Sequence, residues 1–281
     1  MLVTMKEILD RAKQGDYGVT APNVQSEDTV RAVIEVAEEC NAPMIIDVNA
    51  FIHTDLPWFL AMIRDLAGKS PMPIAINLDH GKSYEDIMLG IRSGFTSIMV
   101  DRSSLPYEQN VAETKEVVKM CKPLNMSVEA ELGHVGMGNN YAVDGVSNLT
   151  DPEEAAKFIA ETGIDCLAVA VGTAHGRYKG TPHIDFERLA AIREACGDTP
   201  LVLHGGSGTG DENLQKAVHT GIQKVNLATD LIVAGKEELA EFIKDPNFDK
   251  WQLIPTFKRG YKNRLKHYVE LFDQAGKAWT K

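Results

Sequence analysis

The sequence lacks any apolar run long enough to cross a membrane, and its amino-terminal stretch MLVTMKEILDRAKQG is charged rather than signal-like. A membrane-spanning helix needs about 20 mostly apolar residues. Cysteine is scarce as well, and Cys40, Cys121, Cys166 and Cys196 form no CxxC pair. Isolated cysteines within apolar segments are typical of small buried side chains in a reducing compartment. We therefore predict a cytoplasmic protein with no membrane partner.

Positive charge is also in deficit. Lysine and arginine together number 29 against 40 aspartates and glutamates, which gives a formal net charge of −11. This balance disfavours nucleic-acid and membrane-surface partners, although a local basic pocket for a phosphorylated ligand remains compatible with it. The basic stretch TFKRGYKNRLKHY near the carboxyl end is interpreted as a solvated helix face rather than a nucleic-acid surface.

What the sequence does contain is a repeating alternation of apolar runs and helix-like segments. With 281 residues, 44% of them hydrophobic, the chain is large enough to bury a substantial core. Runs that are apolar on both faces are typical of a parallel sheet covered by helices. Eight such runs are predicted strands: GVTAPN, APMIIDVN, PIAINLDH, SIMVD, SVEAELG, CLAVAVG, PLVLHGG and KVNLATD.

The segments between these runs carry helix-end signals. Ser26 is a predicted N-cap, and Thr150 with Glu153 is a predicted capping box. Eight βα units are the number that closes a (β/α)8 TIM barrel, the α/β fold that we predict. The doubly wound alternative would have a glycine-rich fingerprint after its first strand, and APNVQSED has none. We expect a single domain over 1–281, with the barrel over about 17–235 and extra helices over about 237–281.

Polar side chains stand at the carboxyl ends of the predicted strands, where barrel enzymes place their chemistry. These residues are Asp79-His80-Gly81, Asp101, Glu129, Glu131, His175-Gly176 and His204-Gly205. A single histidine is most often structural, but three in equivalent positions change that interpretation. Three neutral imidazoles with an open fourth position are typical of catalytic zinc. We therefore predict a Zn²⁺ site at His80, His175 and His204.

The glycine-rich loop after His204 has a second predicted role. The sequence GGSG exposes successive backbone N–H groups and the Ser207 hydroxyl before the helical pattern DENLQKAVHTG. On the eighth strand, Asn226 and Thr229 add further donors. The loops after strands seven and eight are the recurrent phosphate site of TIM barrels, and a helix N-terminus favours an anion. The sequence therefore predicts a phosphate site here.

Five motifs occur in order between about Tyr17 and Asp230: LDHG, SVEAELG, VGTAHGRYKG, LVLHGGSG and KVNLATD. Together they closely resemble the class II, zinc-dependent ketose-bisphosphate aldolases, the family of fructose- and tagatose-bisphosphate aldolases. The resemblance implies a TIM-barrel enzyme that uses Zn²⁺ and binds a monovalent cation, Na⁺ or K⁺, near the phosphate. A homodimer or homotetramer is expected.

The resemblance also implies a role for individual residues. It makes His80, His175 and His204 the zinc ligands and Asp79 the proton donor and acceptor at the aldehyde oxygen. Asp101 and Glu131 match acidic residues that support the metal or bind it in an alternative position. The segments that hold the dihydroxyacetone phosphate end match Gly176, Gly205, Gly206, Ser207, Asn226, Leu227, Ala228 and Thr229. Weaker candidates are Asn23, Asn49 and Lys179, with Arg259 and Arg264 for a distal phosphate.

The sequence departs from the family pattern near the expected position of the sugar hydroxyls and distal group. The loop HVGMGNNYAVDGVSN has Asp144 as its only carboxylate, where many relatives have consecutive acidic residues. The C3 proton transfer is therefore open between His134 and Asp144. Asn49 stands where a serine or similar small residue is expected, and Arg102 replaces a small residue.

From these features we expect reversible cleavage of a ketose 1-phosphate or 1,6-bisphosphate to dihydroxyacetone phosphate and an aldehyde such as glyceraldehyde 3-phosphate. Zinc stabilises the negative charge that cleavage leaves beside the ketone, and Asp79 moves the C4 hydroxyl proton. A metal-dependent barrel hydrolase is an alternative, but such barrels typically have an HxH pair on the first strand, which GVTAPN lacks. A non-catalytic sugar-phosphate-binding protein is a second alternative, supported only by the altered loop.

Overall fold

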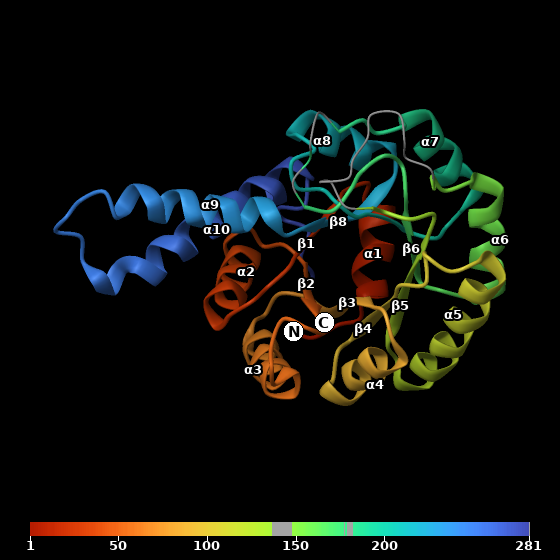
Figure 1. The fold of residues 1–281 in the computed structure, drawn as a ribbon, viewed down its shortest axis with the longest axis horizontal. Coiled ribbons are helices and arrows are strands. Elements are labelled where there is room, and N and C mark those ends of the chain that lie inside the picture. The colour runs from red at the N-terminus through yellow and green to blue at the C-terminus, as the bar shows by residue number, and fades with distance from the viewer. Residues whose placement is uncertain (137–147, 177, 179–181, 281) are drawn as a thin grey trace.

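The computed structural model describes residues 1–136, 148–176, 178 and 182–280. Eight parallel strands form one sheet that curls into a barrel, with helices around its outside (Figure 1). The strands are β1 (Val19–Pro22), β2 (Met44–Asn49), β3 (Ile74–Gly81), β4 (Ser97–Val100), β5 (Ser127–Leu132), β6 (Cys166–Val169), β7 (Leu201–Leu203) and β8 (Ile222–Leu227). Each lies within or overlaps one of the eight predicted runs, so the predicted TIM barrel is confirmed.

The sheet order β1-β8-β7-β6-β5-β4-β3-β2 makes β1 and β2 the two edge strands. Between them the barrel is nearly closed by a single parallel bridge that joins Asn23 and Asp47. The backbone N–H of Val24 donates to the Asp47 carbonyl at 3.1 Å across the same seam. Because all strands are parallel, their carboxyl ends meet at one mouth of the barrel.

The other mouth is closed by α1 (Met5–Gln14), which follows the N-cap Thr4. Its buried side chains include Ile8 and Leu9, and they pack in one cluster with the inward-facing apolar residues of the barrel, such as Val19 and Ile45. Among the described residues, the carboxyl-end mouth is therefore the open end of the barrel.

The remaining helices cover the outside of the sheet, and a second, larger apolar cluster lies between helices and strands. They are α2 (Glu27–Glu39), α3 (Leu56–Lys69), α4 (Tyr84–Ser93), α5 (Tyr107–Cys121), α6 (Pro152–Thr162), α7 (Phe186–Ala195) and α8 (Asp211–Thr220), with a short 3₁₀ turn at η1 (Lys122–Leu124). Among the described residues, no helix combines the length and apolar character of a membrane span. All four cysteines are buried and unbridged.

Two predicted helix starts have different outcomes. Ser26 caps α2 through a capping box, as predicted. The predicted capping box at Thr150 and Glu153 is wrong, because Asp151 is the N-cap of α6 and accepts from the Glu153 backbone N–H at 2.9 Å. Thr150 is buried, and its hydroxyl donates to the Leu132 carbonyl instead. The Thr150 side chain, which the local pattern assigns to the helix cap, therefore links the end of β5 to the residue after β6.

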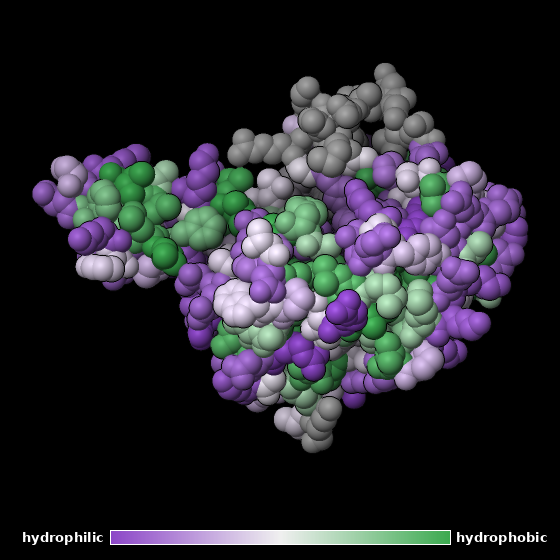
Figure 2. Space-filling view, turned by 60° about the horizontal axis from the view of Figure 1, so that its bottom comes forward, coloured by the Kyte–Doolittle hydropathy of each residue, from purple (hydrophilic) through white to green (hydrophobic). Residues whose placement is uncertain are grey.

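After the barrel, α9 (Thr229–Phe242), the turn η3 (Lys250–Gln252) and α10 (Leu253–Leu271) form a hairpin whose outer end projects from the barrel (Figure 1). We call the outer part, residues 237–254, the arm. Ile243, Trp251 and Ile254 are exposed on it, and Figure 2 shows apolar surface there, at the left of the view.

The inner part of α10 returns to the barrel wall. Tyr261 is fully buried and donates its hydroxyl to the Asn23 carbonyl at 3.0 Å. Lys258 and Lys262 form ion pairs with Glu35 on α2. The basic stretch is thus a helix, as predicted, but two of its lysines are paired across the helix interface rather than freely solvated.

Candidate active site

Three histidines from three strand ends meet at the carboxyl-end mouth. His80 ends β3, His175 follows β6, and His204 comes directly after β7. The ring centroid of His80 lies 4.8 Å from that of His175 and 4.8 Å from that of His204. Potential ligand nitrogens of all three lie within 4.8 Å of one another. The structure therefore brings the predicted zinc ligands together.

The hydrogen bonds of these histidines leave at least one nitrogen of each ring for a metal. His80 Nδ1 lies 2.9 Å from Asp101, and His204 Nε2 lies 2.8 Å from Glu129. Among the described residues, His204 Nδ1 and His175 Nε2 are buried without a partner. A buried unpaired nitrogen is costly, and its lone pair suits a metal ion. These residues fit a Zn²⁺ ion, and carboxylates on the far side of the ring are the usual support of a ligating histidine.

The backbone of β3 explains how adjacent residues both reach the site. Neighbouring residues of a regular strand point to opposite faces. Here the pairing of β3 with β4 shifts between Leu78 and Gly81, and His80 has a φ of 53°. A bulge re-aims side chains, and a positive φ at a residue other than glycine costs about 1–3 kcal/mol. With this bulge, His80 Nε2 lies 3.8 Å from Asp79 Oδ1.

The Asp79 carboxylate is held by three side-chain amides. Its Oδ2 accepts from Asn23 at 2.8 Å and from Asn49 at 3.0 Å. Its Oδ1 accepts from Asn226 at 3.2 Å. Burial opposes ionisation, but the neighbouring imidazoles, a buried lysine and the Asn23 amide hold the pKa of Asp79 well below its usual range. Asp79 is therefore a fixed carboxylate at neutral pH.

The protonation of the histidines differs because their surroundings differ. Burial disfavours the charged form of His80, but the Asp79 charge and the hydrogen bond that His80 donates to Asp101 raise its pKa to about 9. Burial and the nearby imidazoles lower the pKa of His175 to about 3. His175 is thus neutral at physiological pH, which is the state that ligates zinc.

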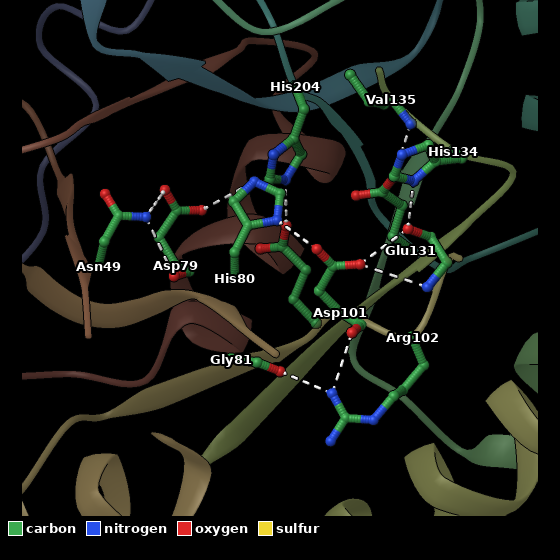
Figure 3. Close-up of polar contacts among 12 residues, drawn as sticks. Asn49, Asp79, His80, Gly81, Asp101, Arg102, Glu131, His134, Val135 and His204 are labelled. Carbon is green, nitrogen blue, oxygen red and sulfur yellow. Dashed lines mark hydrogen bonds and ion pairs between the residues drawn. The ribbon is translucent and has the colours of Figure 1, made fainter. Parts of the chain in front are cut away.

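Asp101 and Glu131 lie on the side of His80 away from Asp79 (Figure 3). Asp101 accepts from the Ser103 hydroxyl at 2.8 Å, and its pKa is below its usual range because the His80 and Ser103 bonds outweigh burial. Burial raises the pKa of Glu131, whose Oε2 has no partner among the described residues. His80, Asp101 and Glu131 form a second set of potential ligand atoms within 4.8 Å of one another.

On one side of the histidines lies a cavity of about 250 Å³. It unites most residues that the resemblance assigns to the substrate, namely Asn23, Asn49, Gly176, Gly205, Gly206, Ser207, Asn226, Ala228 and Thr229. Leu227 is not among them, because its side chain is buried in the cluster between helices and sheet. Lys179 lies outside the described residues. The described lining includes no lysine or arginine, and it meets the start of α9 rather than α8, the helix that sequence analysis favoured.

The loop after β7 requires glycine for its own packing. Gly205 has a φ of 71°, and a Cβ added there would lie 2.4 Å from the Ala174 carbonyl oxygen. Ser207 accepts from the Asp230 backbone N–H at 3.1 Å, in the first turn of α9. This serine therefore joins the loop after β7 to the start of α9, a role beyond the one that the sequence predicts.

A second cavity, of about 490 Å³, lies on the other side of the histidines, lined by Asn49, Phe51, His80, Lys82, His134 and His175 among others. His80 and His175 line both cavities, so a metal held by them would sit between the two. Arg102, which sequence analysis places near the sugar, is buried and bonded to Glu113 and to the Gly81 carbonyl. Figure 3 shows its guanidinium turned away from the histidines.

A charged group that the sequence motifs do not single out lies beneath the site. Lys224 is fully buried, with its Nζ 2.8 Å from Glu129 and 3.3 Å from Asp47. Burial would lower the pKa of Lys224, but the two carboxylates hold it above its usual range. Burial raises the pKa of Asp47 to about 8. The available signal was a lysine two residues before Asn226 in the same strand, because that spacing places both on the inner face.

The fold and the histidine cluster define a (β/α)8-barrel enzyme whose polar site lies at the carboxyl ends of the strands. The family model "Fructose-bisphosphate aldolase class-II" matches residues 3–277. The chain therefore belongs to the class II fructose-bisphosphate aldolase family, as its motifs suggest, and is an aldolase, a lyase.

Solved structures agree with this assignment. The YdjI aldolase from Escherichia coli K12 is 33% identical with a TM-score of 0.89, over 99% of this chain and 100% of that one. A putative fructose-1,6-biphosphate aldolase from Coccidioides immitis is 28% identical with a TM-score of 0.85, over 97% of each chain. The fructose-bisphosphate aldolase of Campylobacter jejuni, 22% identical with a TM-score of 0.83 over 98% of this chain and 97% of that one, shares the fold.

Proposed function

We propose that this protein is a zinc-dependent aldolase that reversibly cleaves a ketose 1-phosphate or 1,6-bisphosphate into dihydroxyacetone phosphate and an aldehyde such as glyceraldehyde 3-phosphate. The observation that carries the proposal is the meeting of His80, His175 and His204 beside Asp79, between two cavities. These three histidines would hold the ion. When bound, zinc supplies Lewis-acid stabilisation of the negative charge that carbon–carbon cleavage leaves on the ketone fragment.

Asp79 moves the C4 hydroxyl proton in this proposal, and its contacts indicate which oxygen does so. A carboxylate oxygen accepts about two hydrogen bonds. Oδ2 already accepts from Asn23 and Asn49, whereas Oδ1 accepts only from Asn226 among the described side chains. Oδ1 is also the oxygen nearer His80. We assign Oδ1 as the atom that takes the proton in cleavage and returns it in condensation.

The smaller cavity takes the phosphate of the dihydroxyacetone phosphate half. Its described lining holds no lysine or arginine but combines the glycine loop after β7 with the start of α9. Backbone N–H groups and a helix N-terminus bind a phosphate without lysine or arginine. Loop carbonyls nearby are the proposed ligands of a monovalent cation, Na⁺ or K⁺.

The larger cavity takes the far end of the aldehyde half, and the reacting carbons C3 and C4 lie between the two cavities, with Asp79 lining the smaller one. His134 lines the larger cavity, and its Nδ1 lies 2.9 Å from the Ser103 hydroxyl. Among the described residues, it is our candidate for the C3 proton transfer. The other candidate, Asp144, lies outside the described residues. Arg259 is paired with Glu238 and, like Arg264, does not line either cavity, so both remain candidates only for a distal phosphate in an assembly.

We further propose a cytoplasmic homodimer or homotetramer. The arm supports association, because Trp251 and Ile254 are 76% and 60% exposed at its outer end and contiguous exposed apolar surface is typical of interfaces. Light scattering of the purified protein tests this, and a monomer at all concentrations would overturn it.

The test of the activity is a metal-stripped sample assayed with and without added Zn²⁺. Fructose 1,6-bisphosphate, tagatose 1,6-bisphosphate and their 1-phosphates are offered for cleavage. Dihydroxyacetone phosphate is offered with phosphorylated and unphosphorylated aldehydes for condensation, and the adducts are identified by NMR. We expect aldol cleavage and condensation only with added metal. Full activity of the metal-stripped sample would contradict the proposal. Ester hydrolysis without aldol cleavage would favour a hydrolase, and ligand binding without turnover would favour a binding protein.

A further inference from the structure

A layer of charged and polar side chains lies inside the barrel, directly beneath the candidate active site. We call it the buried ionic layer; its members are Asp47, Asn77, Glu129 and Lys224, none of which has solvent exposure. Each stands two residues before a residue of the site, in the pairs Asp47 and Asn49, Asn77 and Asp79, Glu129 and Glu131, and Lys224 and Asn226. Alternate residues of a strand share a face and are about 6.6 Å apart, so the layer is the next one down.

Glu129 joins this layer to the histidine cluster with its two oxygens. Oε1 lies 2.8 Å from His204 Nε2, and Oε2 lies 2.8 Å from Lys224 Nζ. A carboxylate only accepts hydrogen bonds, so His204 Nε2 carries the proton in this contact. A neutral ring protonated at Nε2 has its lone pair on Nδ1. That atom is the His204 nitrogen that is buried without a partner among the described residues.

Lys224 determines how the Glu129 carboxylate is held. Its ammonium group is the nearest described cation to Glu129 and binds the oxygen that His204 does not use. Without Lys224, Glu129 would have one buried oxygen with neither a partner nor a counter-charge, which is unfavourable. The carboxylate would then rotate, and its contact with His204 would loosen.

We propose that Lys224, acting through Glu129, is a positioning residue that fixes the tautomer and ring orientation of His204, so that Nδ1 is presented to the metal. The inference rests on the proposed function only in taking His204 as a metal ligand. Lys224 does not contact substrate in this arrangement, and its effect reaches the site entirely through the Glu129 carboxylate.

Asp47 provides a matched control within the same layer. It lies 3.3 Å from Lys224 and accepts from Asn77 at 2.9 Å. None of its described contacts is with a histidine of the cluster. Replacing Asp47 by asparagine therefore removes an acidic group from beside Lys224 but leaves both Glu129 contacts, with Lys224 and with His204, in place.

The first measurement is zinc affinity of the full-length protein, by competition with a chromophoric chelator. Lys224→Met and Glu129→Gln are compared with Asp47→Asn and the unmodified protein. We expect the first two to bind Zn²⁺ about 10–100-fold more weakly, the usual effect of losing a partner of a ligating histidine. We expect Asp47→Asn to bind within about threefold of the unmodified protein, since it leaves the Glu129 contact intact.

The second measurement is imidazole ¹⁵N NMR of the metal-free proteins, with His204 assigned by its loss in His204→Gln. The unmodified protein and Asp47→Asn should show His204 protonated at Nε2, and the other two variants should show mixed tautomers. If Lys224→Met does not fold, Glu129→Gln and the double variant Asp47→Asn/Lys224→Met carry the test. An unchanged His204 tautomer with unchanged zinc affinity, or an equal loss in Asp47→Asn, would overturn the inference.

These readouts separate the two proposals. If the unmodified protein binds no zinc, the proposed function fails, while the tautomer in metal-free protein still tests the Lys224 inference. If the unmodified protein binds zinc and the variants bind it equally well with His204 unchanged, only the Lys224 inference fails.

Discussion

Asn49 donates a hydrogen bond from its side-chain amide to Oδ2 of Asp79 at 3.0 Å. The two residues are register partners at the ends of neighbouring strands β2 and β3. Asn49 stands where the family resemblance leads one to expect a smaller side chain. The contact is therefore a feature by which this chain holds its proposed acid–base group.

Replacing Asn49 by alanine should lower kcat/KM about tenfold, because a hydrogen bond to a charged group contributes about 1.5–3 kcal/mol and two other amides remain. Steady-state kinetics with the best substrate of the panel measures this. As controls, the zinc content and the urea unfolding midpoint of the variant should match those of the unmodified protein. If kcat/KM is also unchanged, the contact between Asn49 and Asp79 does not contribute to catalysis.

Replacing Asp79 by asparagine should lower kcat for cleavage about 10²–10⁴-fold, the usual contribution of a positioned acid–base group. Because Asp79 is assigned to the C4 hydroxyl, exchange of the C3 proton of dihydroxyacetone phosphate with D₂O should persist. NMR follows this exchange in the absence of an aldehyde. Equal loss of exchange and cleavage would contradict the assignment of Asp79 to the aldehyde half.

Removal of the metal should also reduce stability. A ligand that binds only the folded state stabilises it by about 2.7 kcal/mol at a free concentration of 100 Kd. Metal-free protein should therefore unfold at lower urea concentration, and added Zn²⁺ should restore the midpoint. His175→Ala removes one proposed ligand and should not respond to zinc in this way; a full zinc response in that variant would exclude His175 as a ligand.

Replacing Gly205 by alanine should destabilise the protein more than replacing Gly163. Both glycines have a φ of 71°, so both substitutions carry a conformational cost of about 1–2 kcal/mol. A Cβ at Gly205 would meet the Ala174 carbonyl oxygen at 2.4 Å, whereas at Gly163 it would meet nothing within 4 Å. Urea unfolding of the two variants isolates the steric part. Equal losses would mean that the loop moves aside without cost.

The ion pairs of Glu35 with Lys258 and Lys262 should contribute a pH-dependent stability. Burial raises the pKa of Glu35, but the two lysines outweigh it and hold the pKa below its ordinary value of 4.5. A group whose folded-state pKa is lowered stabilises the protein above its unfolded pKa, and that contribution is lost as the pH falls through the folded value.

Glu35→Gln should therefore cost about 0.5 kcal/mol at pH 7, a small value because solvent screens this partly exposed pair. The difference should vanish in acid, well below pH 4.5. Urea unfolding across pH measures it. Glu38→Gln removes the same charge from α2 without breaking any ion pair of the described residues, and a similar pH-dependent loss there would contradict a specific role for Glu35.

Local pattern was sufficient for the strands, the barrel and the three histidines. Short apolar runs indicate the strands of a βα repeat, and a histidine followed by glycine marks the end of a strand. The motifs LDHG and LVLHGG therefore predict the positions of His80 and His204 directly. Local pattern was insufficient for Thr150, which the sequence assigns to a helix cap and the structure places between β5 and β6. It was also insufficient for Leu227, whose strand-end position does not reveal that it faces the helices.

The sequence by itself determined the parallel barrel, the end at which the site lies and the residue types that gather there, because strand periodicity and strand direction are local properties. Only the tertiary structure decided which side chains meet across the barrel. The contacts of Asn23, Asn49 and Asn226 with Asp79, and of Lys224 with Glu129, join residues from different strands. Such contacts depend on register and barrel closure, which arise from packing the whole chain and have no signature in any one segment.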